Sequence, residues 1–167
     1  RNDTTVVETF MANTYVVTGC NRGLGLEFVR QLVARGEQVI GTARNLGDLK
    51  GPAESGVKTH ALDVSDVESI ERFSETMSGQ AIDVLINNAG VGVHSKPFES
   101  LDFNEMEEFF ATNTVGALRV FRALLPALRL GSLKKVVSLT SKMGSIADNR
   151  SGAAYSYRVS KAGLNMA

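Results

Sequence analysis

Five short apolar runs rich in β-branched residues recur along the chain, and longer segments with a helical apolar period separate them. Each run has the length of a buried strand, and each longer segment can return the chain to the same edge of a sheet. The runs lie at 14–17, 38–43, 58–62, 83–87 and 135–140. This alternation predicts an α/β fold with a doubly wound parallel sheet and helices on both faces.

Four segments of helical period lie between or after these runs. The first covers 24–35, and the second begins at Ser65, which forms a capping-box pattern with Glu68 three residues on. The third is a long helix over 102–125, and the fourth opens at 151 and continues to 167. The long helix offers these side chains for burial: Met106, Phe109, Phe110, Ala117, Val120 and Phe121.

Length, net charge and cysteine content indicate how many domains the chain forms and which kinds of partner it has. A chain of 167 residues can enclose one core, so we expect a single domain over 13–167 after an N-terminal extension over 1–12. The net charge is zero, which indicates neither a nucleic-acid nor a membrane partner. The single cysteine, Cys20, excludes an internal disulfide and favours a reducing, cytoplasmic setting. No apolar run approaches the ~20 residues that span a bilayer.

A glycine-rich loop, TGCNRGLG at 18–25, joins the first predicted strand to the first predicted helix. Gly19, Gly23 and Gly25 allow a tight turn and a close backbone approach, and the helix N-terminus offers amide donors to a pyrophosphate. Three glycines alone could be a plain connection. The strand–loop–helix context instead favours the dinucleotide-binding loop of a Rossmann fold.

The end of the second strand bears on the choice of cofactor. NAD-binding proteins place an acid about 20 residues after the loop, where it binds the ribose 2′-hydroxyl. Here that place reads Thr42, Ala43, Arg44, and Arg22 lies inside the loop. Both arginines could be plain surface charges, but two cations without the acid favour the 2′-phosphate of NADP(H).

Tyr157 and Lys161 are four residues apart, so a helix places both side chains on one face. Free tyrosine has a pKa of about 10, which is too high for a good general base at neutral pH. A neighbouring ammonium favours the phenolate. The pair can therefore transfer a proton, although alone this spacing more often marks a solvated helix face.

Taken together, these motifs resemble the short-chain dehydrogenase/reductase family over roughly residues 13–167. The TGCNRGLG loop, NNAG at 87–90 and the YSYRVSK segment occur in the family's order. The spacing of the glycines differs from that of the family's extended branch of epimerases and dehydratases. Within the family, the chain is most similar to carbonyl reductases of the C-factor/Sniffer type.

The resemblance implies a catalytic tetrad of Asn113, Ser141, Tyr157 and Lys161. Tyr157 would exchange the proton with the substrate oxygen, and Ser141 would hydrogen-bond that oxygen. Lys161 would favour the tyrosine's ionised form and bind the nicotinamide ribose, while Asn113 would hold a water of the proton relay. The implied cofactor contacts are Gly19, Arg22, Gly23, Leu24, Gly25, Arg44, Asp63, Val64, Asn88, Ala89, Gly90, Tyr157 and Lys161.

Other tyrosine, serine, histidine and cysteine side chains lack the neighbours that a catalytic, metal-binding or redox role would require. Tyr155 has no lysine four residues on, and Ser138 is expected within the sheet. His60 and His94 have no cluster of ligands around them, so no metal site is expected. Cys20 has no resolving partner nearby, which argues against a redox role.

The resemblance is incomplete at the C-terminal end. Members of the family continue beyond the Tyr–Lys helix into two more strands, a Pro-Gly turn beside the nicotinamide and a substrate lid. We therefore expect an exposed edge at 135–140 and a sheet face short of cover. The alternative function is a non-catalytic NADP-binding or protein-interaction fragment. The substrate cannot be inferred, because the lid usually shapes its pocket.

The oligomeric state also stays open. In this family the helices that carry the asparagine and the tyrosine commonly form a homodimer or homotetramer. The excess of apolar side chains at Phe109, Phe110 and Phe121 is compatible with such an interface, and equally with burial against the sheet.

Overall fold

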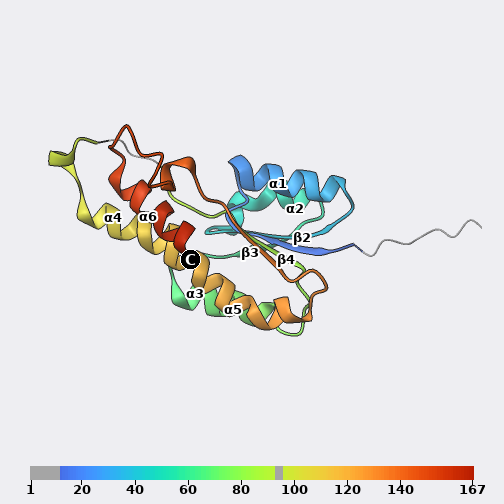
Figure 1. Cartoon of the computed structure of the whole chain (residues 1–167). Coiled ribbons are helices and arrows are strands. Elements are labelled where there is room, and N and C mark those ends of the chain that lie inside the picture. The colour runs from blue at the N-terminus through green and yellow to red at the C-terminus, as the bar shows by residue number, and fades with distance from the viewer. Residues whose placement is uncertain (1–11, 93–95) are drawn as a thin grey trace, which may run out of the picture.

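A five-stranded parallel sheet organises the chain, in the order β3-β2-β1-β4-β5 (Figure 1). This computed structural model describes residues 12–92 and 96–167. The strands are β1 (Thr14–Val17), β2 (Gln38–Ala43), β3 (Lys58–Ala61), β4 (Val84–Asn87) and β5 (Lys135–Ser138). The predicted doubly wound fold is confirmed, and every strand begins within one residue of its predicted start.

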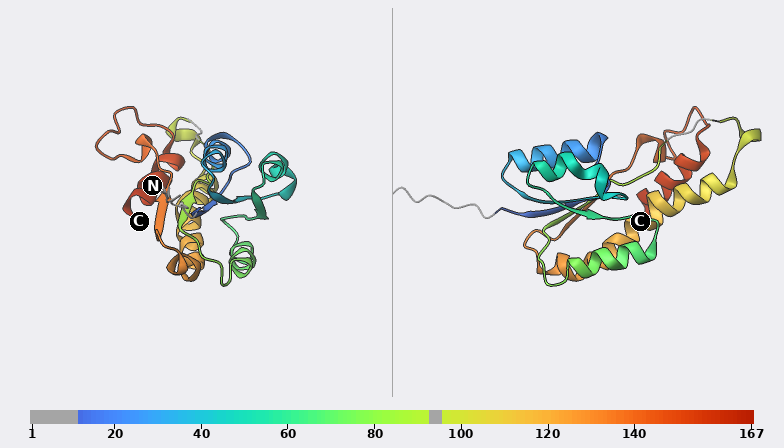
Figure 2. Two further views of the ribbon diagram at one scale, coloured as in Figure 1. Left: turned by 90° about the vertical axis from the view of Figure 1, so that its right-hand side faces the viewer. Right: turned by 180° about the vertical axis from the view of Figure 1, so that it is seen from behind.

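Helices cover both faces of the sheet (Figures 1 and 2). On one face lie α1 (Gly23–Ala34) and α2 (Lys50–Glu54), and on the other lie α3 (Val67–Thr76) and α5 (Ala117–Leu130). The remaining two helices, α4 (Phe103–Phe110) and α6 (Tyr155–Met166), pack against each other beyond the end of the sheet. None of the helices within the described residues has the length and apolar character needed to cross a membrane.

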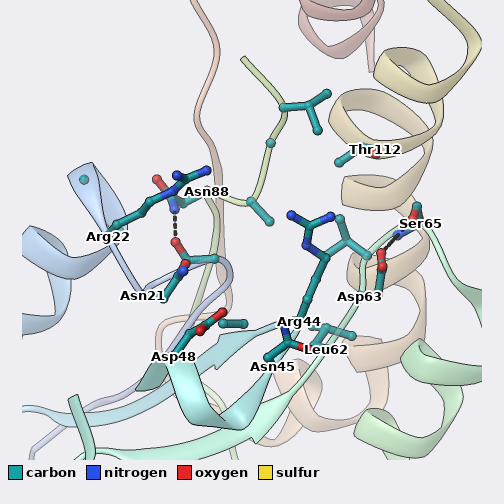
Figure 3. Close-up of a pocket in the computed structure, with 18 of the residues that line it drawn as sticks. Asn21, Arg22, Arg44, Asn45, Asp48, Leu62, Asp63, Ser65, Asn88 and Thr112 are labelled. Carbon is teal, nitrogen blue, oxygen red and sulfur yellow. Dashed lines mark hydrogen bonds between the residues drawn. The ribbon is translucent and has the colours of Figure 1, made fainter. Parts of the chain in front are cut away.

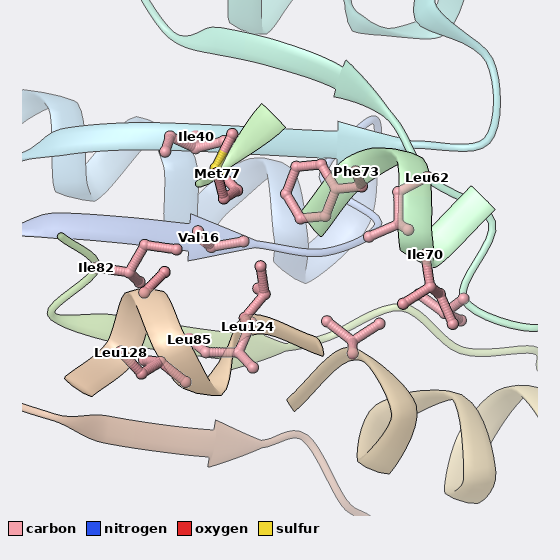
Figure 4. Close-up of a cluster of buried hydrophobic side chains, with 13 residues drawn as sticks. Val16, Ile40, Leu62, Ile70, Phe73, Met77, Ile82, Leu85, Leu124 and Leu128 are labelled. Carbon is pink, nitrogen blue, oxygen red and sulfur yellow. The ribbon is translucent and has the colours of Figure 1, made fainter. Parts of the chain in front are cut away.

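The core consists of one apolar cluster on each face of the sheet. Successive strand residues point to opposite faces, so Val16 packs toward α3 and α5 while Val17 packs toward α1. Figure 4 shows the first cluster, in which Phe73 and Leu124 close over Val16. Each such side chain contributes about 1.5–3 kcal/mol by leaving water. Burial on both faces explains why the central strands read as continuous apolar runs.

The predicted long helix exists, but its interior and its end differ from the prediction. Between α4 and α5, residues Ala111–Gly116 form a π-helical segment. The helix also passes Pro126 and ends at Leu130, whereas the prediction ended it at 125. Leu124 and Leu128 are both buried in the core, and their burial outweighs the backbone hydrogen bond that the proline removes.

The N-terminus of α3 has a different cap from the predicted one. Asp66, not Ser65, is the N-cap residue, and its carboxylate accepts hydrogen bonds from the amides of Glu68 (3.1 Å) and Ser69 (3.3 Å). The Ser65 hydroxyl instead donates to the carboxylate of Asp63 at 2.6 Å. The predicted capping box was wrong because Asp63 engages that hydroxyl.

The β5 strand is exposed on all its residues, as expected. It pairs with β4, and among the described residues no strand pairs with its other side. Val137 remains 44% exposed, whereas Val17 at the centre of the sheet is fully buried. The β5 edge of the sheet is therefore far less covered than its centre.

Candidate active site

The glycine loop packs directly against the turn that follows β4. Gly19 has a φ of +64°, and a Cβ there would lie 2.8 Å from the Cα of Ala89. A Cβ on Gly25 would lie 2.4 Å from both the Gly19 carbonyl oxygen and the Asn88 side-chain nitrogen. Neither position accepts a side chain, so the sequence places glycines where two backbones meet.

Thr18 joins the ends of β1 and β4, a role that sequence reasoning missed. Its hydroxyl oxygen accepts hydrogen bonds from the amides of Asn88 and Ala89, both at 3.0 Å. The Asn88 amide group donates in return to the carbonyls of Thr18 and Gly19, both at 2.9 Å. The signal was present, because Thr18 opens the TGCNRGLG motif.

A cleft of about 370 Å³ opens beside this junction, at the carboxyl ends of the strands (Figure 3). Its lining includes eleven of the predicted cofactor contacts, which are Gly19, Arg22, Gly23, Leu24, Gly25, Arg44, Asp63, Val64, Asn88, Ala89 and Gly90. It also includes two acids that sequence reasoning missed, Asp48 and Glu108. Tyr157 and Lys161 lie outside this lining.

Two cations and three acids line the cleft, which are Arg22, Arg44, Asp48, Asp63 and Glu108. Arg22 and Arg44 are exposed, and neither forms an ion pair with any other residue in the described parts of the chain. Asp63 accepts hydrogen bonds from the Ser65 amide and hydroxyl, which fix its carboxylate at the rim. Figure 3 shows the Arg44 side chain extending into the cleft. The arrangement suits an anionic group near the end of β2.

Tyr157 and Lys161 lie on one face of α6, as their spacing predicts. The Lys161 ammonium nitrogen is 5.8 Å from the Tyr157 ring centroid and donates a 2.8 Å hydrogen bond to the Leu139 carbonyl. Lys161 is buried, and this burial lowers its pKa from the ordinary value. The Leu139 bond ties α6 to the segment that leads to Ser141.

Ser141 follows β5 and caps a 3₁₀ turn, Lys142–Gly144. Its hydroxyl oxygen accepts from the Met143 amide at 3.1 Å. Because the oxygen acts as an acceptor in this bond, its own proton remains available for donation. A Cβ on Gly144 would lie 2.8 Å from the Lys161 carbonyl group, so this turn lies against α6.

Asn113 sits in the π-helical segment, and its side chain is 1% exposed. The side-chain oxygen accepts from the Val91 amide at 2.8 Å, and the side-chain nitrogen donates to the Ser160 hydroxyl at 3.0 Å. A Cβ on Gly90 would lie 2.9 Å from that same oxygen. The enclosed carboxamide therefore serves to tie α6 and the turn after β4 to the long helix.

Ser160 and Thr114 complete this tie, and neither was predicted. The Ser160 hydroxyl donates to the Tyr157 carbonyl at 2.8 Å, and the Thr114 hydroxyl donates to the Ser160 carbonyl at 2.6 Å. Ser160 directly precedes Lys161 in the YSYRVSK segment, but its partners Thr114 and Asn113 are 46 and 47 residues away. Local spacing carries no signal for such contacts.

The side chains to which the sequence analysis gave no catalytic role make packing contacts or are buried. The Tyr155 ring contacts Phe98 edge-on at 5.5 Å, and the His60 ring contacts Phe73 at 5.6 Å. Burial raises the pKa of the Cys20 thiol to about 11, which keeps it protonated. Within the described residues no group of three or more His, Cys, Asp or Glu could hold a metal. His94 lies outside the described residues.

Comparison with known proteins agrees with this geometry. A family model described as short chain dehydrogenase matches residues 13–167. C-signal of Myxococcus xanthus is 47% identical over 95 residues, which cover 57% of this chain and 57% of that protein. The chain thus aligns with little more than half of C-signal.

Two solved structures have a similar fold. The carbonyl reductase Sniffer of D. melanogaster superposes with a TM-score of 0.85 at 28% identity, over 93% of this chain and 72% of that one. The NADPH-bound carbonyl reductase from chicken fatty liver superposes with a TM-score of 0.82 at 32% identity, over 94% and 71%.

Proposed function

The chain belongs to the short-chain dehydrogenase family of oxidoreductases, and from this membership we propose that it interconverts a carbonyl compound and its alcohol with NADP(H). The observation that carries the proposal is the 2.8 Å bond from the Lys161 ammonium to the Leu139 carbonyl. This bond holds the helix of Tyr157 and Lys161 against the segment that carries Ser141. The phenol of Tyr157, the hydroxyl of Ser141 and the ammonium of Lys161 can then act together on one substrate oxygen.

The cleft residues fit a nicotinamide dinucleotide. Gly19 and Gly25 leave room for close backbone approach beside the N-terminus of α1, where a pyrophosphate would lie. Asp63 and Val64 would lie beside the adenine, and Leu24 and the turn after β4 would contact the remainder. Arg44 and Arg22 would pair with a 2′-phosphate, and this supports NADP(H) over NAD(H). The chicken reductase, which is similar in fold, was solved with NADPH.

When bound, the nicotinamide supplies or accepts the hydride. In the reducing direction Tyr157 gives its phenolic proton to the substrate oxygen as negative charge develops there. Ser141 donates a hydrogen bond to the same oxygen and stabilises that charge. Lys161 binds the nicotinamide ribose, and its positive charge stabilises the phenolate that the reaction leaves.

Asn113 contributes through the backbone as well as through its side chain. Its carboxamide is already bonded to Val91 and Ser160. We therefore assign a relay water to the main-chain carbonyl of Asn113 in the π-helical segment, where the regular helical bonding pattern is interrupted. The side chain keeps that segment in place.

We also propose that the protein acts in the cytoplasm as a homodimer or homotetramer. Phe110 on α4 and Val159 on α6 are 39% and 46% exposed, and both line an apolar groove. Their exposure supports contact between copies through these two helices.

A cofactor titration tests the proposal. We expect NADPH to bind the chain saturably and more tightly than NADH, as followed by nicotinamide fluorescence. Turnover of aldehydes or ketones from a broad panel should then follow. Binding of NADPH without turnover of any carbonyl would instead support a non-catalytic NADP-binding protein. Absence of binding to either cofactor would overturn the assignment of the cleft.

A further inference from the structure

Arg158 directly follows Tyr157 on α6, and its side chain contacts the loop in front of the helix. The Nε atom donates to the carbonyls of Gly152 (3.1 Å) and Ala153 (3.0 Å). One terminal nitrogen, Nη2, donates to the Ser151 hydroxyl at 2.9 Å. This half-buried guanidinium therefore forms its bonds within the protein, beside the predicted proton donor.

The contacted loop has an unfavourable backbone conformation. Gly152, Ala153 and Ala154 have φ values of 63°, 55° and 48°, so three successive residues are left-handed and two of them carry a Cβ. In that region the Cβ crowds the following carbonyl. Such a turn persists only where surrounding contacts hold it.

Arg158 donates hydrogen bonds to all three carbonyls of this turn. Its side chain bonds those of Gly152 and Ala153, and its backbone amide donates to the Ala154 carbonyl at 2.9 Å. This last bond opens α6, whose N-cap residue is Ala154. The start of the helix that carries Tyr157 is thus bonded through Arg158 at three successive carbonyls.

The same guanidinium reaches the segment of Ser141. The other terminal nitrogen, Nη1, lies 3.5 Å from the Met143 carbonyl, a long hydrogen bond, in the turn that Ser141 caps. Lys161 bonds the Leu139 carbonyl on the other side of Ser141. Arg158 and Lys161, both on α6, therefore bond carbonyls that lie two residues after and two residues before Ser141.

We propose that Arg158 is a positioning residue that fixes the Ser141 hydroxyl relative to the Tyr157 hydroxyl. It holds the left-handed turn that starts α6 and the turn that Ser141 caps, so both groups reach one substrate oxygen. The proposal rests on the reductase function proposed above. Arginine suits this place because its planar fork of five N–H donors can bond several acceptors at once.

The test compares Arg158→Met and Arg158→Lys with Arg150→Met. Arg150 lies in the same loop, is exposed, and makes no side-chain hydrogen bond or ion pair with any described residue, so its variant controls for loss of charge. A fourth variant combines Arg158→Met with Ala153→Gly and Ala154→Gly. Glycine adopts the left-handed conformation without crowding and reduces the need for the anchor.

In Arg158→Met we expect faster amide hydrogen exchange over 142–154, unchanged exchange over 14–34, and NADPH affinity within about twofold of the unmodified chain. We expect kcat/KM to fall about 10- to 100-fold, mainly through kcat, because misplaced reacting groups lose that much. The kcat/KM of Arg158→Lys should lie between those of Arg158→Met and the unmodified chain. Adding the two glycine substitutions to Arg158→Met should restore part of kcat. Arg150→Met should match the unmodified chain.

Three results would overturn the proposal. The first is unchanged exchange over 142–154 in Arg158→Met, and the second is faster exchange with unchanged kcat/KM. The third is loss of NADPH binding in the same variant, because the defect would then extend beyond the loop. If the unmodified chain turns over no carbonyl, the proposed reductase function fails, and the exchange data alone still decide whether Arg158 fixes the loop.

Discussion

The part of the molecule proposed to bind the cofactor (the cofactor half) and the part proposed to carry the reacting groups (the catalytic half) are held in place by different means. The cofactor half consists of β1, β2, β3 and the glycine loop. Helices bury both faces of β1 and β2, whereas β3 is a partly exposed edge strand. The catalytic half consists of β5, the segment 139–154 and α6, and here the strand is wholly exposed. In the first, backbones meet directly at Gly19 and Gly25. In the second, long side chains of α6 reach across to carbonyls.

This difference has a physical basis. A cofactor that is bound through its phosphates needs backbone amides at fixed positions, and glycines allow that approach. A proton-transfer site needs side chains of chosen chemistry, which must be held by other side chains. Mutations at the glycines of the cofactor half should therefore act through the fold, and mutations of the reacting side chains in the catalytic half should act through turnover.

The largest effect on turnover is expected from Tyr157→Phe in the catalytic half. Removing the phenolic hydroxyl should reduce kcat by about 10²- to 10⁴-fold, because the proton donor is lost. NADPH affinity should stay within a few-fold, because the ring remains. Steady-state kinetics and fluorescence titration measure both quantities. Turnover retained in this variant would disprove the tetrad assignment, and Tyr155→Phe is the matched control.

Asp83 joins the start of β1 to the loop that precedes β5, at the amino ends of the strands, and its loss should reduce stability most. Its carboxylate accepts from the amides of Thr14 (2.8 Å), Ser132 (2.7 Å) and Leu133 (3.3 Å). Asp83→Asn sets an N–H group against one of these donors. We expect the free energy of unfolding to fall by about 3 kcal/mol at neutral pH in urea denaturation.

The pH dependence of this effect has a definite sign. Desolvation opposes ionisation of Asp83, but its three backbone hydrogen bonds outweigh that penalty and hold its pKa below the ordinary value. The stabilisation is therefore complete above the ordinary pKa of about 3.9 and is lost as the pH falls through the lower, folded-state value. The gap between the unmodified chain and Asp83→Asn should be constant near pH 7 and narrow below about pH 4. A gap independent of pH would contradict the ionised assignment.

Gly25→Ala tests whether backbone contact organises the cofactor half. The added Cβ would lie 2.4 Å from the Gly19 carbonyl, so the loop must move. We expect a loss of about 2 kcal/mol in unfolding free energy, together with weaker NADPH binding. Gly51→Ala is the control, because nothing lies within 4 Å of a Cβ there. Equal stability of the two variants would show that the loop tolerates side chains.

Arg44→Asp should have the smallest effect, confined to the choice of cofactor. An acid at the end of β2 repels a 2′-phosphate and can bind a ribose hydroxyl. We expect the preference for NADPH over NADH to fall about tenfold, from the loss of one charge-assisted contact. Arg30→Asp on the exposed face of α1 controls for net charge. An unchanged preference would place the 2′-phosphate elsewhere.

Most of the fold could be predicted from local sequence patterns. Strands buried on both faces require continuous apolar runs, so the sequence around Val16 and Leu85 places strands there. The glycine loop could be predicted for a similar reason, since Gly19 and Gly25 mark close backbone contact. Eleven predicted cofactor contacts line one cleft because the carboxyl ends of parallel strands meet at one edge.

Contacts between distant segments depended on the tertiary structure. The sequence by itself set the order of elements and the chemistry of Tyr157, Lys161 and Ser141, because strand length, helical period and side-chain type are local properties. The π-helical segment around Asn113 and the bonds of Arg158 and Ser160 followed only from packing. Such bonds depend on which surfaces meet, and hydrogen-bonding groups separated by many residues leave no periodic pattern in the chain.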